Sequence, residues 1–182
     1  DPAAMARVQG QWFMKNDTFD AELRQRFGPT IDAALAGQLD DWAASAEGRL
    51  ALLIVLDQFT RNVFRGHANS FAGDARALAL ACEGIARGHD QAIAPLARIF
   101  CYLPLEHAED AAMQARSVAL FTALRDDPEA QPKALFDGTL DYARKHQEVI
   151  ARFGRFAHRN AVLGRASTPE ERAYLAQPGA GF

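Results

Sequence analysis

The sequence contains few cysteines and no long apolar run, and these absences exclude two classes of protein. Cys82 and Cys101 lie in the apolar stretches ALACEGI and RIFCYLP, with a spacing that fits neither a zinc site nor a CxxC redox motif. We therefore expect two inert, buried thiols in a reducing compartment. The longest apolar run, LALLIVL at residues 50–56, is far too short to span a membrane, and no basic-then-apolar leader opens the sequence. We expect a cytoplasmic protein with no membrane partner.

An excess of basic residues is also missing. The 182 residues carry 20 Lys and Arg against 23 Asp and Glu, for a net charge of −3. Proteins that bind nucleic acid generally need a basic surplus to displace counterions, so we expect no nucleic-acid partner. With 49% hydrophobic and 24% charged residues, the composition is typical of an ordinary globular domain.

The common enzyme signatures are absent as well. The sequence has no GxSxG elbow, GxGxxG loop, P-loop or HExxH motif, and it lacks the ExxH spacing of di-iron helical bundles. We therefore expect no cofactor and no metal site. Catalytic groups assemble in space and not in sequence, so His107, His146 and His158 could still form an acid–base site with nearby carboxylates.

Helical patterns cover almost the whole chain, and no alternating strand pattern or Asn-Gly hairpin occurs. The predicted helices span residues 1–13, 17–27, 30–35, 47–64, 74–87, 90 or 95 to 104, 109–124 and 132–153, with a short helix after residue 40. Gly28-Pro29 is expected to end the second helix, and Thr168-Pro169-Glu170-Glu171 is a capping box that begins the last one. The predicted fold is all-α, with antiparallel helix pairs, in a single all-helical domain over residues 1–182 whose tail 177–182 is frayed.

The first polar cluster, LDQFTRN at residues 56–62, follows the most apolar helix. Asp57 and Arg61 are four residues apart, so their side chains can meet on one helix face. Because Asp57 directly follows the apolar run, we expect it to be partly buried, and a buried carboxylate needs a partner. The pair is either a structural ion pair that closes the core helix or part of a ligand site.

The second polar cluster is PLEHAED, which starts at Pro104. A helix that begins near Pro104 places Glu106 and Asp110 on one face and His107 on another. Glu106, Glu109 and Asp110 also suit the first turn of a helix, where the helix dipole favours negative charge. An acidic, solvated first turn is therefore the competing interpretation.

The third cluster is HQEVIARFGRFAHRN, residues 146–160. His146 shares a helix face with Val149, Ile150 and Phe153, so we expect it to face inward, as hydrogen-bonded core histidines do.

This cluster opens a stretch of unbalanced positive charge. Four arginines and no acidic residue lie between Val149 and Pro169: Arg152, Arg155, Arg159 and Arg165. Internal carboxylates, a bound anion or an acidic partner segment could balance them, and arginine suits carboxylate or phosphate through paired hydrogen bonds. The first of these is favoured, and its candidate acids are Asp57, Glu106, Glu109 and Asp110.

Several long stretches resemble one family of bacterial proteins. They are WFMKNDTFDAELRQRFG, LALLIVLDQFTRNVFRG, SFAGDARAL, IFCYLPLEHAEDAAMQ and HQEVIARFGRFAHRNAVLGRAST. Together they cover nearly the whole chain from residue 12, and they resemble domain-of-unknown-function family 924. This resemblance implies an all-helical fold similar to the tetratricopeptide-repeat superfamily, a right-handed array of stacked helix pairs. It implies no reaction and no catalytic residues, because the family has no established activity.

The three clusters favour a binding function. Since each follows an apolar helix, we predict that they converge on one site for a small anionic ligand or an acidic peptide. The predicted ligand-binding residues are Asp57, Arg61, Asn62, Glu106, Asp110, Arg155, His158, Arg159 and Asn160. The alternative is a hydrolase-like enzyme in which His107 or His146 is the general base and Arg159 stabilises an anionic intermediate. A purely structural polar network is the third possibility, and the oligomeric state stays open.

Overall fold

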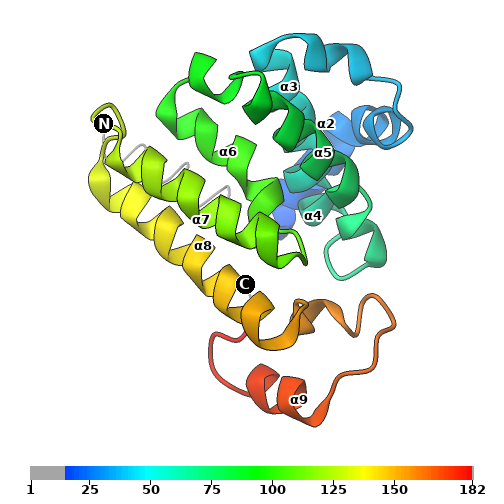
Figure 1. Cartoon of the computed structure of the whole chain (residues 1–182). Helices are drawn as coiled ribbons and strands as arrows, with labels where there is room; N and C mark the ends of the chain where they lie inside the picture. The colour runs from blue at the N-terminus through cyan, green and yellow to red at the C-terminus, as the bar shows by residue number, and fades with distance from the viewer. Residues whose placement is uncertain (1–14, 182) are drawn as a thin grey trace.

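The computed structural model describes residues 15–181, and all regular secondary structure in this range is helical, which confirms the all-α class (Figure 1). The α-helices are α2 (Asp17–Leu35), α3 (Ala46–Leu53), α4 (Thr60–Val63), α5 (Asp74–Ala86), α6 (Pro95–Glu106), α7 (Ala111–Asp126), α8 (Lys133–Phe153) and α9 (Pro169–Leu175). Short 3-10 helices lie at Asp40–Ala44, Ala68–Phe71, Asp90–Ala92 and Ala157–Arg159. The helix predicted for residues 1–13 lies outside the described residues.

Successive helices pack as neighbours around one large apolar core. α5 contacts α6, α6 contacts α7, and α7 lies alongside α8 (Figure 1). The largest fully buried apolar side chains of this core are Ile31, Leu52, Leu53, Leu56, Ile99, Leu105, Phe121, Leu124 and Phe136. Val149, Ile150 and Phe156 form a second, smaller apolar cluster. Since Phe156 also contacts the ring of His146 and the guanidinium of Arg159, this second cluster adjoins the polar motifs.

Two prolines that are predicted to mark helix boundaries lie inside helices. The predicted stop at Gly28-Pro29 is wrong, because α2 continues through it to Leu35. The helix start considered near Pro104 is wrong as well, because Pro104 lies in the last turn of α6, whereas the predicted end of the preceding helix near Pro104 is confirmed. A proline inside a helix removes a backbone hydrogen bond, and burial of one face of each helix in the core outweighs that loss.

The helix after α6 begins at Ala111, with Asp110 as its N-cap. The Asp110 carboxylate accepts a hydrogen bond from the backbone N–H of Met113 at 2.8 Å. Glu106 ends α6 and Asp110 begins α7, so the predicted common face for these two residues is wrong.

The most apolar helix is not a uniform α-helix. α3 passes into a π-helical segment, Ile54–Phe59, which continues into α4. Such wider turns often occur at functional sites. Asp57 lies in this segment with only 1% of its surface exposed, so its predicted burial is confirmed.

The predicted end of α8 and the predicted start of α9 are confirmed. α8 ends at Phe153, and Gly154 follows in the left-handed conformation with a φ of 70°. α9 begins with the predicted capping box, in which Thr168 Oγ1 accepts from the backbone N–H of Glu171 and the Glu171 carboxylate accepts from that of Thr168. Among the described helices, none is long and apolar enough to cross a membrane.

Candidate functional site

A cavity of about 620 Å³ is lined by the π-helical segment, α4, α6, α7, α8 and the 157–159 turn. This volume lies within the range of about 300–1,000 Å³ that is typical of small-molecule sites. Its polar lining side chains are Gln58, Arg61, Asn62, Arg65, Ser70, Glu106, His107, Thr139, Tyr142, His146, His158 and Arg159. Its larger apolar ones are Phe71, Ile99, Leu103, Phe121 and Leu135.

The cavity has a polar end and an apolar end. Along α6 the lining residues change from Ile99 and Leu103 to Glu106, and along α8 they change from Leu135 to His146. The polar ends of both helices meet, since Glu106 Oε1 lies 3.2 Å from His146 Nδ1. A ligand in this cavity would therefore contact polar groups at one end and apolar groups at the other.

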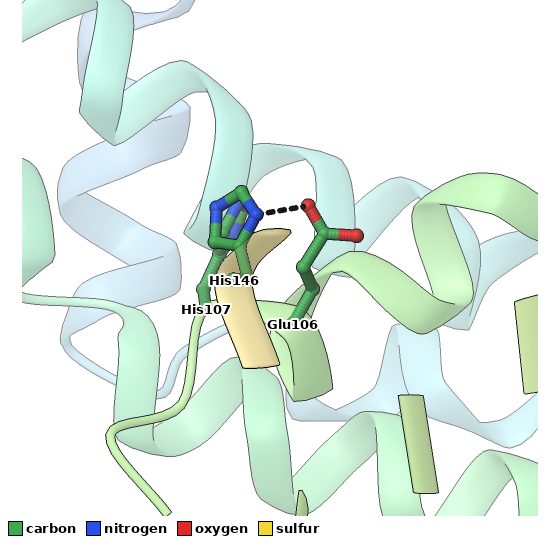
Figure 2. Close-up of side chains that lie close together, drawn as sticks. All are labelled: Glu106, His107 and His146. Atoms are coloured by element: carbon green, nitrogen blue, oxygen red, sulfur yellow. Dashed lines mark ion pairs between the residues drawn. The ribbon is translucent and has the colours of Figure 1, made fainter. Parts of the chain in front are cut away.

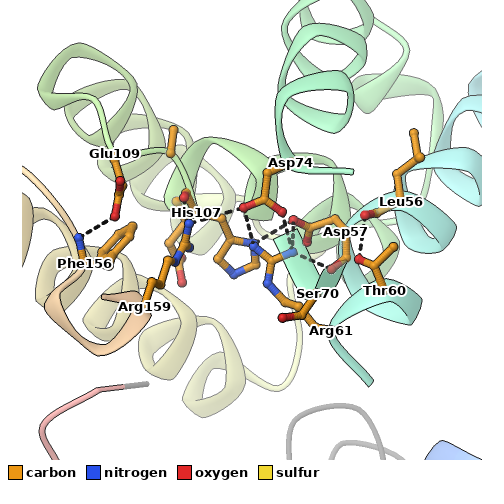
Figure 3. Close-up of polar contacts among 12 residues, drawn as sticks. Leu56, Asp57, Thr60, Arg61, Ser70, Asp74, His107, Glu109, Phe156 and Arg159 are labelled. Carbon is orange, nitrogen blue, oxygen red and sulfur yellow. Dashed lines mark hydrogen bonds and ion pairs between the residues drawn. The ribbon is translucent and has the colours of Figure 1, made fainter. Parts of the chain in front are cut away.

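Asp57 holds His107 and Arg61 at the polar end (Figure 3). Its Oδ1 lies 2.8 Å from His107 Nδ1 and 3.0 Å from Arg61 Nη1. Burial acts to raise the pKa of Asp57, but Arg61 and His107 outweigh it and hold this pKa well below its usual range. Because an ionised carboxylate only accepts hydrogen bonds, His107 Nδ1 carries the ring proton and donates it to Asp57.

His107 is neutral at pH 7 in this setting. Burial and the charge of Arg61 lower its pKa, and Asp57 offsets this only in part. Its Nε2 therefore carries a lone pair and can accept a proton or bind a metal ion. A histidine held by a buried carboxylate in the wall of a cavity has the geometry of an oriented general base.

Asp74 joins Arg61 to Arg159. Its carboxylate lies 2.9 Å from Arg61 Nη1 and 3.3 Å from Arg159 Nη1 (Figure 3). Arg159 also donates from Nη2 to the carbonyl oxygen of His107 at 3.0 Å. One carboxylate is therefore shared between two guanidinium groups.

Arg159 is a buried cation with an unused donor. Only 7% of its surface is exposed, and its guanidinium lies over the rings of Phe71 and Phe156 at 4.7 and 4.6 Å. Burial and the charge of Arg61 lower its pKa to about 10. Within residues 15–181 its Nε has no hydrogen-bond partner. An unpaired buried donor costs about 1–3 kcal/mol, so this position of Arg159 lowers the stability of the fold.

Glu106 and His146 form a buried, neutral contact (Figure 2). Burial, with a contribution from the charge of Asp57, raises the pKa of Glu106 to about 8. Burial, with a contribution from His107, lowers the pKa of His146 to about 3. Neither group is charged at pH 7. His146 Nδ1 also lies 2.9 Å from the carbonyl oxygen of Tyr142, and since a carbonyl only accepts, this nitrogen carries the proton.

Glu106, His107 and His146 bring three metal-ligating side chains to one point (Figure 2). Each offers one ligand atom, and these atoms lie within 4.8 Å of one another. No metal site is predicted from the sequence, because sequence motifs depend on ligands that lie close together in the chain. Here the end of α6 and the middle of α8 supply the set, and only the fold joins them.

The cavity wall is cationic, although the cluster as a whole is balanced. The guanidinium groups on the wall belong to Arg61, Arg65 and Arg159. The carboxylates that pair with them belong to Asp20, Asp57 and Asp74, and none of these three lines the cavity. Among the described lining residues, Glu106 is the only acid, and it is neutral at pH 7. A ligand in the cavity would therefore contact guanidinium groups and hydrogen-bond donors, whereas the carboxylates that balance their charge do not line the cavity.

Arg155 and Asn160 of the third cluster belong to a separate group. We call it the C-terminal network, and it also contains Glu109, Arg165 and Glu171. Arg155 donates from Nε and Nη2 to Glu171 at 2.6 and 2.8 Å. Arg165 donates from Nη1 and Nη2 to Glu109 at 2.6 and 2.9 Å. Asn160 joins the two pairs, because it donates to Glu171 at 3.2 Å and accepts from Arg165 Nε at 3.0 Å. None of these five residues lines the cavity.

The structure divides the predicted site residues into two groups. Those that line the cavity are Arg61, Asn62, Glu106, His107, His146, His158 and Arg159, and Asp57 lies directly behind them. Those that lie elsewhere are Asp110, Arg155 and Asn160. Asp110 caps α7, and the other two belong to the C-terminal network. The ligand-binding role of each residue stays a prediction.

Internal carboxylates pair with three of the four arginines of the acid-free stretch. The pairs are Arg155 with Glu171, Arg159 with Asp74 and Arg165 with Glu109. Only Glu109 is among the acids predicted for this role. Asp74 and Glu171 escape sequence reasoning because each already has a local role at the start of a helix. The signal that could have found Asp74 is its place within the quoted motif SFAGDARAL.

Comparison with known proteins agrees with this architecture. A family described as a bacterial protein of unknown function (DUF924) matches residues 3–179. The structure of the protein of unknown function ATU0120 from Agrobacterium tumefaciens is 42% identical to this chain, with a TM-score of 0.81 over 97% of this chain and 99% of its own. No curated protein sequence matches the chain. The chain belongs to the bacterial family DUF924, as its long motifs indicate.

Proposed function

We propose that the cavity binds a small molecule with a carboxylate or phosphate group and an apolar body. The observation that carries this proposal is the composition of the wall, where the ionised groups are guanidiniums and the balancing carboxylates lie behind them. An anion would accept hydrogen bonds from guanidinium donors that are already in place on the wall.

The far end of the cavity supports an apolar body. Ile99 and Leu103 of α6 and Leu135 of α8 line it, on turns that precede the polar residues, and Phe121 of α7 lines the cavity as well. Small-molecule sites generally combine apolar walls with a few polar groups that fix the orientation of the ligand. A medium-chain carboxylate would place its head group at Arg159 and its chain along the apolar wall.

Sodium octanoate is the probe for this proposal, with acetate and octanamide as matched compounds. Acetate keeps the charge without the chain, and octanamide keeps the chain without the charge. At about 100 times its dissociation constant a ligand adds about 2.7 kcal/mol to the stability of the folded state, so octanoate should raise the melting temperature by about 5–10 °C. Acetate and octanamide should raise it far less. Equal shifts with octanoate and octanamide would contradict the anion proposal without the use of any variant.

Arg159→Gln tests the position of the head group. It removes the cation and should abolish most of the octanoate shift in thermal melts. Arg144→Gln is the matched control, because Arg144 is an exposed arginine of α8 outside the cavity lining. If Arg159→Gln unfolds the protein and octanoate does not stabilise the wild type, the cluster is the structural network that is the third possibility.

The hydrogen bond between Asp57 and His107 favours a second candidate, an acid–base enzyme at the same cavity. His107 would be the general base, since Asp57 orients its ring and leaves Nε2 unprotonated. Hydrolysis of p-nitrophenyl octanoate provides a direct assay. Turnover by the wild type that falls at least about 100-fold in His107→Gln, with the octanoate melting shift retained, would support it. No turnover above the rate of heat-denatured protein would count against it.

Three further proposals rest on resemblance or composition. The resemblance supports a tetratricopeptide-repeat-like right-handed array of antiparallel helix pairs, whose concave face would also suit an acidic peptide. Composition supports a cytoplasmic location without a nucleic-acid partner. A fluorescent acidic peptide that competes with octanoate would place both ligands in one site.

A further inference from the structure

We infer that Glu106, His107 and His146 form a binding site for one first-row transition-metal dication, with an open coordination position toward the cavity. This site goes beyond the proposed anion site and does not depend on it. All three residues line the same cavity, so an ion held by them would be accessible to small molecules. Catalytic metal sites commonly use three protein ligands and leave one position for water or substrate.

The ligand atoms must move closer together to hold a single ion. The three atoms lie within 4.8 Å of one another. Two ligand atoms of a tetrahedral ion with bonds of about 2.1 Å lie about 3.4 Å apart, so the widest separation must contract by up to about 1.4 Å. Rotation of the three side chains supplies this movement when the ion binds.

Both histidines already have the outer hydrogen bonds that metal-binding histidines need. His107 Nδ1 donates to the Asp57 carboxylate at 2.8 Å, and His146 Nδ1 lies 2.9 Å from the carbonyl oxygen of Tyr142. A metal-binding histidine generally donates its other ring N–H to a carboxylate or a backbone carbonyl, which fixes the ring and its tautomer. One histidine uses each kind of acceptor here, and in both rings Nε2 carries the lone pair. The Glu106 carboxylate lies 3.2 Å from His146 Nδ1, so it turns toward Nε2 when the ion binds.

The local charges also admit a dication. Arg61 and Arg159 oppose a cation at this point, and Asp57 and Asp74 offset them one for one. Glu106 adds a third carboxylate, 3% exposed, which becomes an anion when it binds the metal. The groups around the ion would therefore include three carboxylates and two guanidiniums, for a net charge that is negative before the ion is counted.

The donor set identifies the class of metal. Two imidazoles and one carboxylate suit Zn²⁺ and neighbouring first-row ions, whereas Mg²⁺ and Ca²⁺ prefer oxygen ligands alone. When bound, such an ion would act as a Lewis acid toward a carboxylate, phosphate or water in the open position. Arg159 would then lie on the same wall to orient an anionic group.

Co²⁺ titration of chelator-treated protein tests the site, because Co²⁺ gives visible absorption bands that report its coordination. The wild type should bind one equivalent, and Zn²⁺ should displace it. Glu106→Gln and His107→Gln should each weaken Co²⁺ binding by at least about 100-fold, since even the loss of an outer partner weakens metal sites by about 10–100-fold. His67→Gln is the matched control and should stay within about threefold, because His67 is an exposed histidine outside the cavity lining and outside the three-residue set.

A second measurement needs no variant. In ¹⁵N-labelled wild-type protein, Zn²⁺ should shift the ring nitrogen resonances of His107 and His146 and leave those of His67 and His89 in place. No saturable Co²⁺ binding, or binding that survives Glu106→Gln unchanged, would overturn the inference. The octanoate melts are run in chelator, and the Co²⁺ titration is run without carboxylates. Failure of the metal site is thereby distinguished from failure of the anion site.

Discussion

The cavity and the C-terminal network use the same kinds of side chain in opposite ways. In the network, Arg155 and Arg165 each meet their own carboxylate through two donors. In the cavity, Arg61 and Arg159 share Asp74, and Arg159 Nε has no partner within the described residues. A fully paired network stabilises the fold, whereas an unused buried donor destabilises it until an acceptor arrives. We therefore propose that, for these four arginines, pairing distinguishes a structural role from a binding role better than residue type does.

The pKa values follow the same division. Hydrogen bonds from Arg155 and from the backbone of Thr168 lower the pKa of Glu171 to about 2 and hold it in its charged form. Burial raises the pKa of Glu106 to about 8 and lowers that of Arg159 to about 10, so Glu106 is neutral at pH 7 and Arg159, although shifted toward its neutral form, stays a cation. Groups pushed toward their neutral forms in the wall of a cavity are typical of functional sites.

Substitution of one asparagine in the network and one in the cavity is the most direct test of this difference between the two regions. Asn160 is fully buried and makes hydrogen bonds to Ser167, Glu171 and Arg165, whereas Asn62 is half-buried. Asn160→Ala leaves several buried groups unpaired and should lower the free energy of unfolding by about 2–4 kcal/mol, measured by urea denaturation.

Asn62→Ala is the matched change in the cavity. Asn62 donates one hydrogen bond of 2.7 Å to Asp20, which keeps a second partner in Arg65. Its loss should lower the free energy of unfolding by only about 1 kcal/mol. Equal losses for the two variants would show that the cavity is as tightly coupled to the fold as the C-terminal network, and the distinction drawn from pairing would fail.

The parts of this arrangement that sequence could predict are those in which the partners are near in the chain. The pairing of Asp57 with Arg61 follows from their spacing of four residues, and the capping box follows from four adjacent residues. The pairing of Arg159 with Asp74 spans 85 residues, and only the packing of distant helices creates it. The continuation of α2 through Pro29 was beyond prediction for a similar reason, because tertiary burial outweighs a local preference.

The division of the arginines between cavity and network was equally beyond the sequence. Arg155 and Arg159 are four residues apart in one motif, and both look equally suited to an anion. The short helix Ala157–Arg159 turns the chain between them, so that Arg155 contacts α9 and Arg159 contacts the start of α5. The sequence supplied the residue types, and the turn decided which of them line the cavity.

The pH dependence of stability tests the pairing of Glu171 with Arg155 in the C-terminal network. Glu171 has a folded-state pKa of about 2 against an ordinary value of 4.5, so the folded protein binds a proton here less readily than the unfolded chain. Its stabilisation is therefore complete above about pH 4.5 and is lost as the pH falls toward 2. Urea denaturation between pH 6 and pH 3 should show a shallower fall for Glu171→Gln than for the wild type. Glu170→Gln, a change at the exposed neighbour in the same helical turn, should keep the steeper wild-type fall. If Glu171→Gln also keeps the wild-type slope, the carboxylate is not held in its charged form by Arg155, and the network does not stabilise the fold by the pairing inferred from its geometry.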